Sequence, residues 1–262
     1  MNAPATRPGL TGTRALVTAG ASGIGRAIAD ALIAQGARVH VCDVSDDFLA
    51  DFRKAHAQAG TSRADVASES DVERLFAELA SNLGGLDVLV NNAGIAGPTG
   101  GVDEIAPADW RRTIDVCLTG QFLCAHFAVP MLKAAGGGSI INMSSAAGRF
   151  GYAFRTPYSA AKWGVIGLTQ SLAKELGPAD IRVNAILPGI VAGARMKGVI
   201  ARRAEQLGVS YAEMERTYLD RISLRRMVTA EDVAETVLFL VSGAGRNISG
   251  QSIGVCGNVE SL

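Results

Sequence analysis

Two side chains in this sequence have the types and the spacing that suit proton transfer. Tyr158 and Lys162 are four residues apart within 157–176, a stretch with the apolar period of a helix, so both should lie on one helix face. A neutral phenol is a weak base, and a nearby ammonium stabilises its anion. The pair predicts a tyrosine that exchanges a proton beside a fixed cation. Because this spacing also arises by chance, the interpretation depends on the neighbouring motifs.

A serine that precedes this pair is a third candidate. Ser145 stands thirteen residues before Tyr158 and follows an apolar run at 139–143, which predicts a buried strand. Open α/β sheets bind their ligands at the carboxyl ends of the strands. Ser145 is therefore expected at the ligand-binding edge of a sheet.

A glycine-rich turn near the start of the chain predicts a site for a pyrophosphate. Between an apolar run at 15–18 and a helical pattern that begins at residue 26, the turn contains Gly20, Ser22, Gly23, Ile24 and Gly25. Glycine lets the backbone approach an anion, and free N–H groups at the helix start face it. Asp43 ends the next apolar run, 18 residues after Gly25, within reach of an adenosine ribose. Its carboxylate would repel a 2′-phosphate, and no Lys or Arg stands at Ser22 or Val44, so NAD is favoured over NADP.

The elements that must position these residues follow one rhythm. Short apolar runs alternate with longer amphipathic stretches, a pattern typical of a parallel sheet with helical crossovers. Seven strands are expected, at 15–18, 38–42, 61–64, 86–90, 139–143, 182–187 and 252–255. We therefore predict an α/β fold, a single doubly wound Rossmann-type domain with a seven-stranded parallel sheet and helices on both faces. The domain would span 12–262, after a flexible N-terminal tail at 1–11.

The segment 193–227 interrupts this rhythm, because it contains no apolar strand. A long polar helical insertion after a strand predicts a lid over the binding site. The segment carries eight Lys or Arg against four Asp or Glu, whereas the whole chain has 25 of each. An ordinary solvated helix face would also explain this local charge.

Composition disfavours several other classes. A formal net charge of zero and 5% aromatic residues argue against a nucleic-acid partner. We find no 18-residue apolar run and no signal peptide, so neither a membrane span nor a membrane partner is expected. The four cysteines form no Cys-x-x-Cys pair and do not cluster with the three histidines, so we expect no metal site and a reduced, cytoplasmic chain.

Taken together, the motifs resemble those of a known family. With Asn91-Asn92-Ala93-Gly94 after one strand and Pro188-Gly189 after another, the set is similar to that of the short-chain dehydrogenase/reductase family, in the single-domain form of 3-oxoacyl-ACP reductase-like oxidoreductases. The resemblance covers about residues 12–258. It implies an NAD-dependent oxidoreductase that interconverts a secondary alcohol and a ketone of a small-molecule substrate by hydride transfer, and it implies a homotetramer.

The resemblance also implies a role for each matching residue. Tyr158 would be the general acid/base, Ser145 would hold the substrate oxygen, and Lys162 would bind the nicotinamide ribose. Other cofactor contacts would come from the backbone of Asn91, Asn92, Ala93 and Gly94, from Asp65 and Val66 at the adenine, and from Pro188, Gly189, Ile190 and Val191 at the nicotinamide.

Three positions depart from the family's pattern. Cys117 stands where the family usually has an Asn that helps to hold a water beside the lysine, so its part in a proton relay is doubtful. We predict that a water still links Lys162 to a backbone carbonyl. Ala19 replaces the first glycine of the turn, which a negative φ would accommodate, and Gly193 replaces a Thr that often contacts the nicotinamide.

The substrate is predicted from three arginines. Arg149 and Arg155 flank the route from Ser145 to Tyr158, and Arg195 lies in the insertion. Guanidinium groups pair with carboxylates, which favours a polar or anionic hydroxy or keto substrate. Aromatic residues alternate with the first two arginines and would equally suit an apolar cyclic or acyl ketone; they are Phe150, Tyr152 and Phe154.

An NAD-binding sensor or scaffold with little turnover is an alternative of a different class. The departures at Cys117 and Gly193 motivate it. The intact set of Ser145, Tyr158 and Lys162 argues for an enzyme instead.

Overall fold

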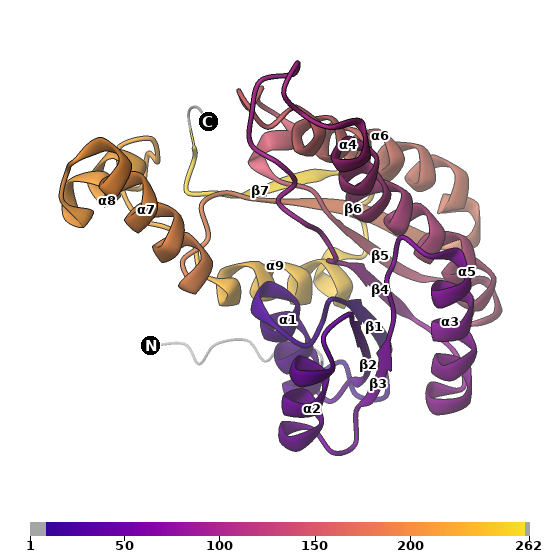
Figure 1. The fold of residues 1–262 in the computed structure, drawn as a ribbon. Helices are drawn as coiled ribbons and strands as arrows, with labels where there is room; N and C mark the ends of the chain where they lie inside the picture. The colour runs from indigo at the N-terminus through magenta and orange to yellow at the C-terminus, as the bar shows by residue number, and fades with distance from the viewer. Residues whose placement is uncertain (1–8, 260–262) are drawn as a thin grey trace.

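Seven parallel strands form one sheet in the order β3-β2-β1-β4-β5-β6-β7 (Figure 1). The computed structural model describes residues 9–259, apart from the side chains of residues 194, 195 and 206. All seven predicted strands are present, which confirms the predicted fold class, and their bounds differ from the predicted ones by at most two residues. The strands are β1 (Arg14–Thr18), β2 (Arg38–Asp43), β3 (Gly60–Arg63), β4 (Val88–Asn91), β5 (Gly138–Met143), β6 (Ile181–Pro188) and β7 (Ser252–Val255).

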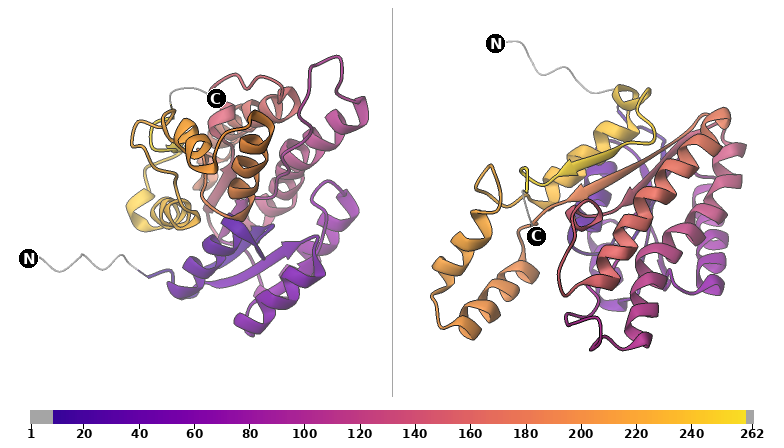
Figure 2. Two further views of the ribbon diagram at one scale, coloured as in Figure 1. Left: turned by 60° about the vertical axis from the view of Figure 1, so that its left-hand side comes forward. Right: turned by 90° about the horizontal axis from the view of Figure 1, so that it is seen from above.

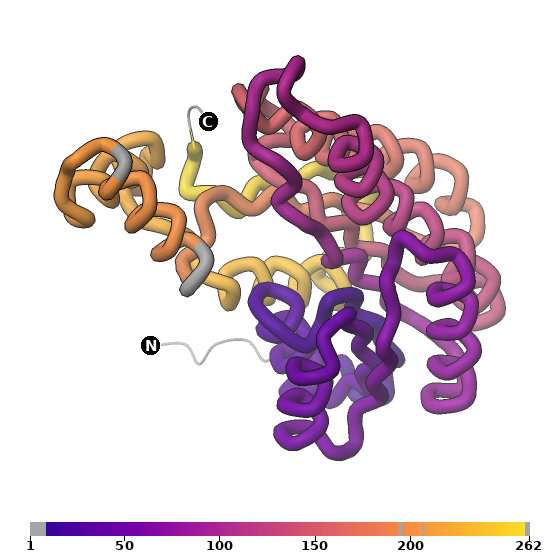
Figure 3. The backbone as a smooth tube through the Cα atoms, viewed as in Figure 1, coloured from indigo at the N-terminus to yellow at the C-terminus, as the bar shows by residue number. Residues whose placement is uncertain are grey.

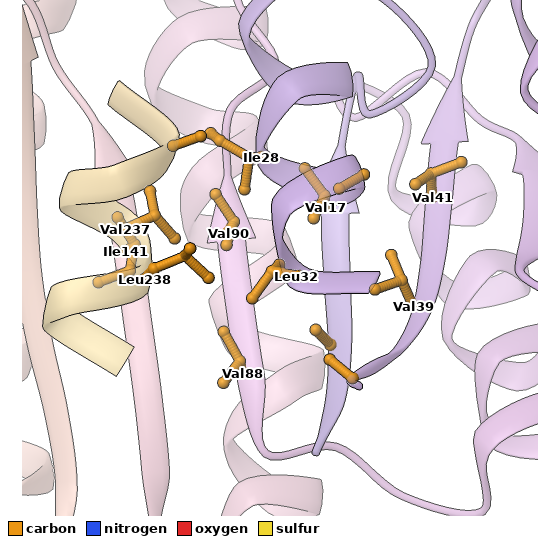
Figure 4. Packing of buried hydrophobic residues seen from close by; sticks show 14 of the residues in the cluster. Val17, Ile28, Leu32, Val39, Val41, Val88, Val90, Ile141, Val237 and Leu238 are labelled. Carbon is orange, nitrogen blue, oxygen red and sulfur yellow. The ribbon is translucent and has the colours of Figure 1, made fainter. Parts of the chain in front are cut away.

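Helices cover both faces of the sheet, so the central strands are buried on both sides. One face carries α1 (Gly23–Ala34), α2 (Asp46–Ala55) and α9 (Ala230–Val241). Figure 4 shows Ile28 and Leu32 of α1 and Val237 of α9 packed against strand residues such as Val17 and Val90. The other face carries α3 (Glu69–Leu83), α5 (Gly120–Ala134) and α6 (Thr156–Leu176).

The strand order reverses beside β1, and this reversal determines where a ligand can bind. From β1 the chain builds β2 and β3 on one side, then returns to place β4 on the other side. The connections that leave β1 and β4 therefore separate at the carboxyl edge and open a crevice. The predicted glycine turn at 20–25 follows β1, and Asn92, Ala93 and Gly94 follow β4.

The predicted tail at 1–11 lies largely outside the described residues, which begin at residue 9. Leu10 is already part of the core, where it is 9% exposed, and its N–H donates to the Gln35 carbonyl at 2.9 Å. Packed structure therefore begins at least two residues before the predicted start of the domain at residue 12.

A long helix that precedes β5 contains a π-helical turn. The run from Pro107 to Ala134 consists of α4 (Pro107–Ile114), the turn η1 (Asp115–Thr119) and α5. By length and composition alone it could cross a membrane, with a mean hydropathy of 1.3, contrary to our expectation that no such stretch exists. In the fold, Cys124, Ala128 and Leu132 of this helix are fully buried against the sheet, as in the core helix of a globular domain.

The segment 193–227 forms a helical hairpin that projects beyond the sheet (Figures 2 and 3). It contains α7 (Ala194–Leu207) and α8 (Tyr211–Leu219), which pack mainly against each other. A small core of Ile200, Ala204 and Met214 lies between them. The two ends of the segment lie side by side, because Val228 donates its N–H to Ile190 and accepts a hydrogen bond from the N–H of Ala192. The remaining short helices are η2 (Ala146–Gly148), η3 (Gly177–Ala179) and η4 (Gly243–Gly245).

The four cysteines are free thiols, and three of them are buried in the core. Burial raises the pKa of the Cys42 thiol to about 12 and also raises that of Cys124. Both side chains therefore stay protonated and act as small apolar packing residues.

Candidate active site

In the turn between β1 and α1, the start of the helix packs closely against the backbone that leaves the strand. Gly23 has a φ of 54°, in the left-handed region, and a Cβ at Gly25 would lie 2.1 Å from the Ala19 carbonyl oxygen. The N–H of Gly20 donates to the Cys42 carbonyl at 3.0 Å, which ties the turn to β2. Ser22 begins α1 without a side-chain capping bond, and Ile24 lies in a first turn that carries no acidic residue. The backbone N–H groups in the first turn of α1 can face an anion.

Ala19 differs from our prediction, because its φ is 46° and not negative. A non-glycine residue in this region is strained by about 1–2 kcal/mol. The Asn92 side-chain amide offsets this strain by donating to the carbonyls of Thr18 and Ala19, at 3.0 and 3.1 Å. The side chain of Asn92, which is distant in the sequence, therefore holds the turn in place.

Thr18 is a site residue that the sequence reasoning missed. Its hydroxyl accepts from the N–H groups of Asn92 and Ala93, at 2.9 and 3.0 Å. These two bonds join the carboxyl ends of β1 and β4. The sequence could have identified Thr18 as a site residue, because it places a hydroxyl at the end of an apolar run.

Asp43 ends β2, and only one of its two carboxylate oxygens accepts a hydrogen bond from the described residues. Its Oδ1 accepts from the Ser45 N–H at 3.1 Å, whereas Oδ2 is buried and has no hydrogen-bond partner among the described residues. The side chain is 7% exposed. A buried acceptor without a donor is costly, so Oδ2 is suited to a ligand hydroxyl.

Three interactions of Asp65 hold the turn after β3 in place. Asp65 donates its N–H to Asp71, accepts from the N–H of Ala67, and pairs with Arg112 at 2.8 Å. The hydrogen bond from the Asp65 backbone is the main cause that holds the pKa of Asp71 below its usual value. Val66 follows in this fixed turn and is buried, as a wall for a flat ring would require.

The residues Tyr158 and Lys162 lie together on α6, as predicted. The Lys162 ammonium is 5.6 Å from the centroid of the Tyr158 ring. Lys162 is 3% exposed, and its Nζ donates to the Met143 carbonyl at 2.8 Å. The backbone of β5 therefore fixes the cation beside the phenol.

Ser145 follows β5 in the loop that α6 packs against. Its Oγ accepts from the Ala147 N–H at 3.2 Å, so its own proton remains available to a ligand. Two hydrogen bonds tie this loop to α6: Ser144 donates to the Lys162 carbonyl, and Ser159 donates to the Ala147 carbonyl. The serine and the tyrosine are therefore held in one rigid unit.

A buried amide network lies beneath this unit, and the sequence reasoning missed most of it. Gln121 donates through Nε2 to the Met143 and Cys117 carbonyls, both at 3.1 Å. The Asn91 side chain donates to Asn142, which donates to Thr169. The predicted role of Asn91 concerned its backbone, and its side chain instead lies in this network. An Asn in the middle of an apolar strand was the signal.

Cys117 lies in the π-helical turn η1, and its thiol contacts the backbone of the segment that follows β4. Its Sγ is 3.4 Å from both the backbone N and the backbone O of Ile95. The residue is fully buried, and a Cβ placed at Gly94 would lie 3.7 Å from its Sγ and 3.4 Å from the Lys162 Nζ. The thiol therefore anchors the 94–95 backbone next to Lys162.

We expect Cys117→Asn to change kcat by less than about tenfold, since Lys162 already has a backbone acceptor at Met143. Steady-state kinetics of the purified variant, with Cys117→Ser as the control for thiol loss, would measure this. A gain of about a hundredfold or more would show that the native proton relay is impaired by the cysteine.

The segment that follows β6 begins at the carboxyl edge of the sheet, beside β7. Pro188 ends β6, and the Gly189 N–H donates to the Val255 carbonyl at 2.9 Å. Ile190 and Val191 follow and pair with Val228. Gly193 has a φ of 151°, a conformation that the family's usual Thr would rarely adopt.

The three predicted substrate arginines lie in different surroundings. The Arg155 guanidinium lies beside Tyr158, with its Cζ 5.4 Å from the ring centroid. Arg149 is exposed and donates to the Ser252 carbonyl, so it lies along β7. The side chain of Arg195 lies outside the described part of the chain.

Comparisons with known proteins identify the family of this chain. A family model described as enoyl-(acyl carrier protein) reductase matches residues 18–258. A cis-4-hydroxycyclohexanecarboxylate dehydrogenase of Sinomonas cyclohexanicum is 39% identical over 95% of this chain and 96% of its own length.

Two solved structures share the fold and most of the chain. An actinorhodin polyketide ketoreductase variant with NADPH is 34% identical, with a TM-score of 0.88 over 95% of this chain and 98% of its own. An NAD+-bound xylitol dehydrogenase is 26% identical, with a TM-score of 0.88 over 95% of this chain and 99% of its own. These relatives give no support to the sensor or scaffold alternative. The chain belongs to the short-chain dehydrogenase/reductase family and is an oxidoreductase that acts on CH–OH groups.

Proposed function

We propose that the protein is an NAD-dependent dehydrogenase that oxidises a secondary alcohol of a polar or anionic small molecule to the ketone. The observation that carries the cofactor choice is the buried, unpartnered Oδ2 of Asp43 at the end of β2. This oxygen suits a ribose hydroxyl, and its charge opposes a 2′-phosphate. The proposal therefore favours NAD over NADP.

The described residues fit a dinucleotide along the whole crevice. The 20–25 turn would hold the pyrophosphate, Asp43 the adenosine ribose, and Asp65 and Val66 the adenine. Asn91, Asn92, Ala93 and Gly94 would line the middle of the crevice, and Pro188, Gly189, Ile190 and Val191 would contact the nicotinamide. NAD supplies the hydride acceptor when it is bound.

The protein's own residues would manage the proton. Ser145 would donate its free O–H to the substrate oxygen and position it. Tyr158 would take the hydroxyl proton as the carbonyl forms, and Lys162 would stabilise the phenolate while Met143 holds its ammonium in place. Burial of Lys162 keeps this interaction away from water, which strengthens it.

We further propose that the enzyme is a cytoplasmic homotetramer. Two large apolar side chains lie half-exposed on the outer helices, Phe122 on α5 and Trp163 on α6, each at 50%. Such side chains are typical of interfaces between subunits. The free thiols suit a reducing compartment.

A spectrophotometric assay at 340 nm tests the proposed function. The full-length protein would be incubated with NAD or NADP and a panel of secondary alcohols that includes cyclic hydroxy acids, sugar alcohols and neutral cyclic alcohols. We expect reduction of NAD with at least one hydroxy acid. Turnover with NADP alone, or no turnover on any alcohol, would contradict the proposal.

A further inference from the structure

One cation, Arg155, lies beside Tyr158 and is not among the cofactor contacts proposed above. Arg155 immediately precedes α6, three residues before Tyr158. Its Cζ lies 5.4 Å from the Tyr158 ring centroid and 5.4 Å from that of Tyr152. The two aromatic rings therefore hold the guanidinium beside the Tyr158 side chain.

The hydrogen-bonding capacity of Arg155 is largely unused. Its Nη2 donates to the Ala96 carbonyl, and its Nε is buried with no partner among the described residues. The ion pairs found in the described part of the chain do not include Arg155. A buried donor without an acceptor costs about 1–3 kcal/mol, so this position is suited to an acceptor from a ligand.

The contrast with other arginines sharpens this assignment. Arg112, near the adenine end, is paired with Asp65, and Arg14 is paired with Asp87. The Arg149 guanidinium donates to a carbonyl of β7. Arg155 thus combines proximity to Tyr158 with the lack of an internal carboxylate.

We propose that Arg155 binds a carboxylate of the substrate, so that the enzyme selects hydroxy acids over neutral alcohols. The inference rests on the proposed function and names its substrate class. Arg155 lies directly before α6 and its Cζ is 5.4 Å from the Tyr158 ring centroid, so a carboxylate bound to it would lie close to the tyrosine. This proximity suits acids whose hydroxyl and carboxyl groups belong to one small molecule. Guanidinium and carboxylate match in a bidentate geometry, which gives both affinity and orientation.

Binding of a substrate analogue that cannot react tests the site directly. Isothermal titration calorimetry would measure the affinity of cyclohexanecarboxylate, and of its neutral carboxamide, for the full-length protein saturated with NAD. We expect Arg155→Gln to weaken carboxylate binding about 100-fold and carboxamide binding less than threefold. Arg155→Lys, which keeps the charge, should retain carboxylate affinity within about tenfold. Arg53→Gln, which removes an exposed arginine of α2, is the matched control and should change neither.

Equal losses of carboxylate and carboxamide binding in Arg155→Gln would overturn the inference, because Arg155 would then only support the backbone at Ala96. Unchanged carboxylate binding would overturn it as well. Tyr158→Phe separates the two proposals, since it should abolish turnover and leave carboxylate binding within about threefold. If the wild type bound carboxylate through Arg155 but oxidised no alcohol, the proposed function would fail and the carboxylate site would stand. If it oxidised neutral alcohols and bound no carboxylate, the reverse would hold.

Discussion

Replacing Tyr158 by Phe is expected to lower kcat by about 10³- to 10⁴-fold. The substitution removes the hydroxyl that exchanges the proton and keeps the ring that contacts Arg155 and Lys162, at 5.4 and 5.6 Å. The site should therefore keep its shape and lose only its acid/base group. NAD affinity should change less than about threefold.

Steady-state and single-turnover kinetics, with NAD affinity measured by fluorescence titration, would check this expectation. Tyr152→Phe is the matched control, because Tyr152 also contacts Arg155 through its ring and its hydroxyl makes no hydrogen bond among the described residues. It should keep kcat within about threefold. If Tyr158→Phe retained a tenth or more of the wild-type kcat, another group would have to transfer the proton.

Asp43→Ser is expected to change the preference of NAD over NADP, as a ratio of kcat/KM values, by about 10³-fold. Loss of the charged acceptor Oδ2 should lower kcat/KM for NAD by about 10- to 100-fold. Loss of the negative charge should also remove a repulsion of about 2 kcal/mol between the carboxylate and a 2′-phosphate, a value between those expected for two unit charges in water and near a protein surface. The two effects act in the same direction on the ratio.

Initial rates with each cofactor, at a fixed saturating concentration of the best alcohol, would measure this ratio. Asp47→Ser is the control, since Asp47 is an exposed acid in the first turn of α2 and leaves β2 intact. A wild type that already prefers NADP would refute the role assigned to Asp43. So would an Asp43→Ser variant with an unchanged ratio.

The strand positions were predictable because central parallel strands are buried on both faces and read as continuous apolar runs. The edge strand β3 was the weakest prediction, since Gly60–Arg63 contains little apolar surface. The glycine turn, Asp43 and the Tyr158–Lys162 spacing were also visible, because each lies within one element or directly after a strand.

What the sequence could not show depends on contacts between distant residues. The left-handed φ of Ala19 is held by the amide of Asn92, and the network through Gln121 joins a helix to the carbonyl that holds Lys162. Arg149 and Arg155 are close in the sequence, yet one lies along β7 and the other beside Tyr158. Only the folded chain determines these directions.

The hairpin of α7 and α8 has its own apolar contacts, centred on Ile200 and Met214, and the segment that contains it is joined to its neighbours by two short bridges, Val191 with Val228 and Ile222 with Val259. Substitutions on its outward face would therefore leave the sheet and the cofactor crevice energetically untouched. Such a part can accumulate changes, or be exchanged between homologous enzymes, faster than the domain that carries it.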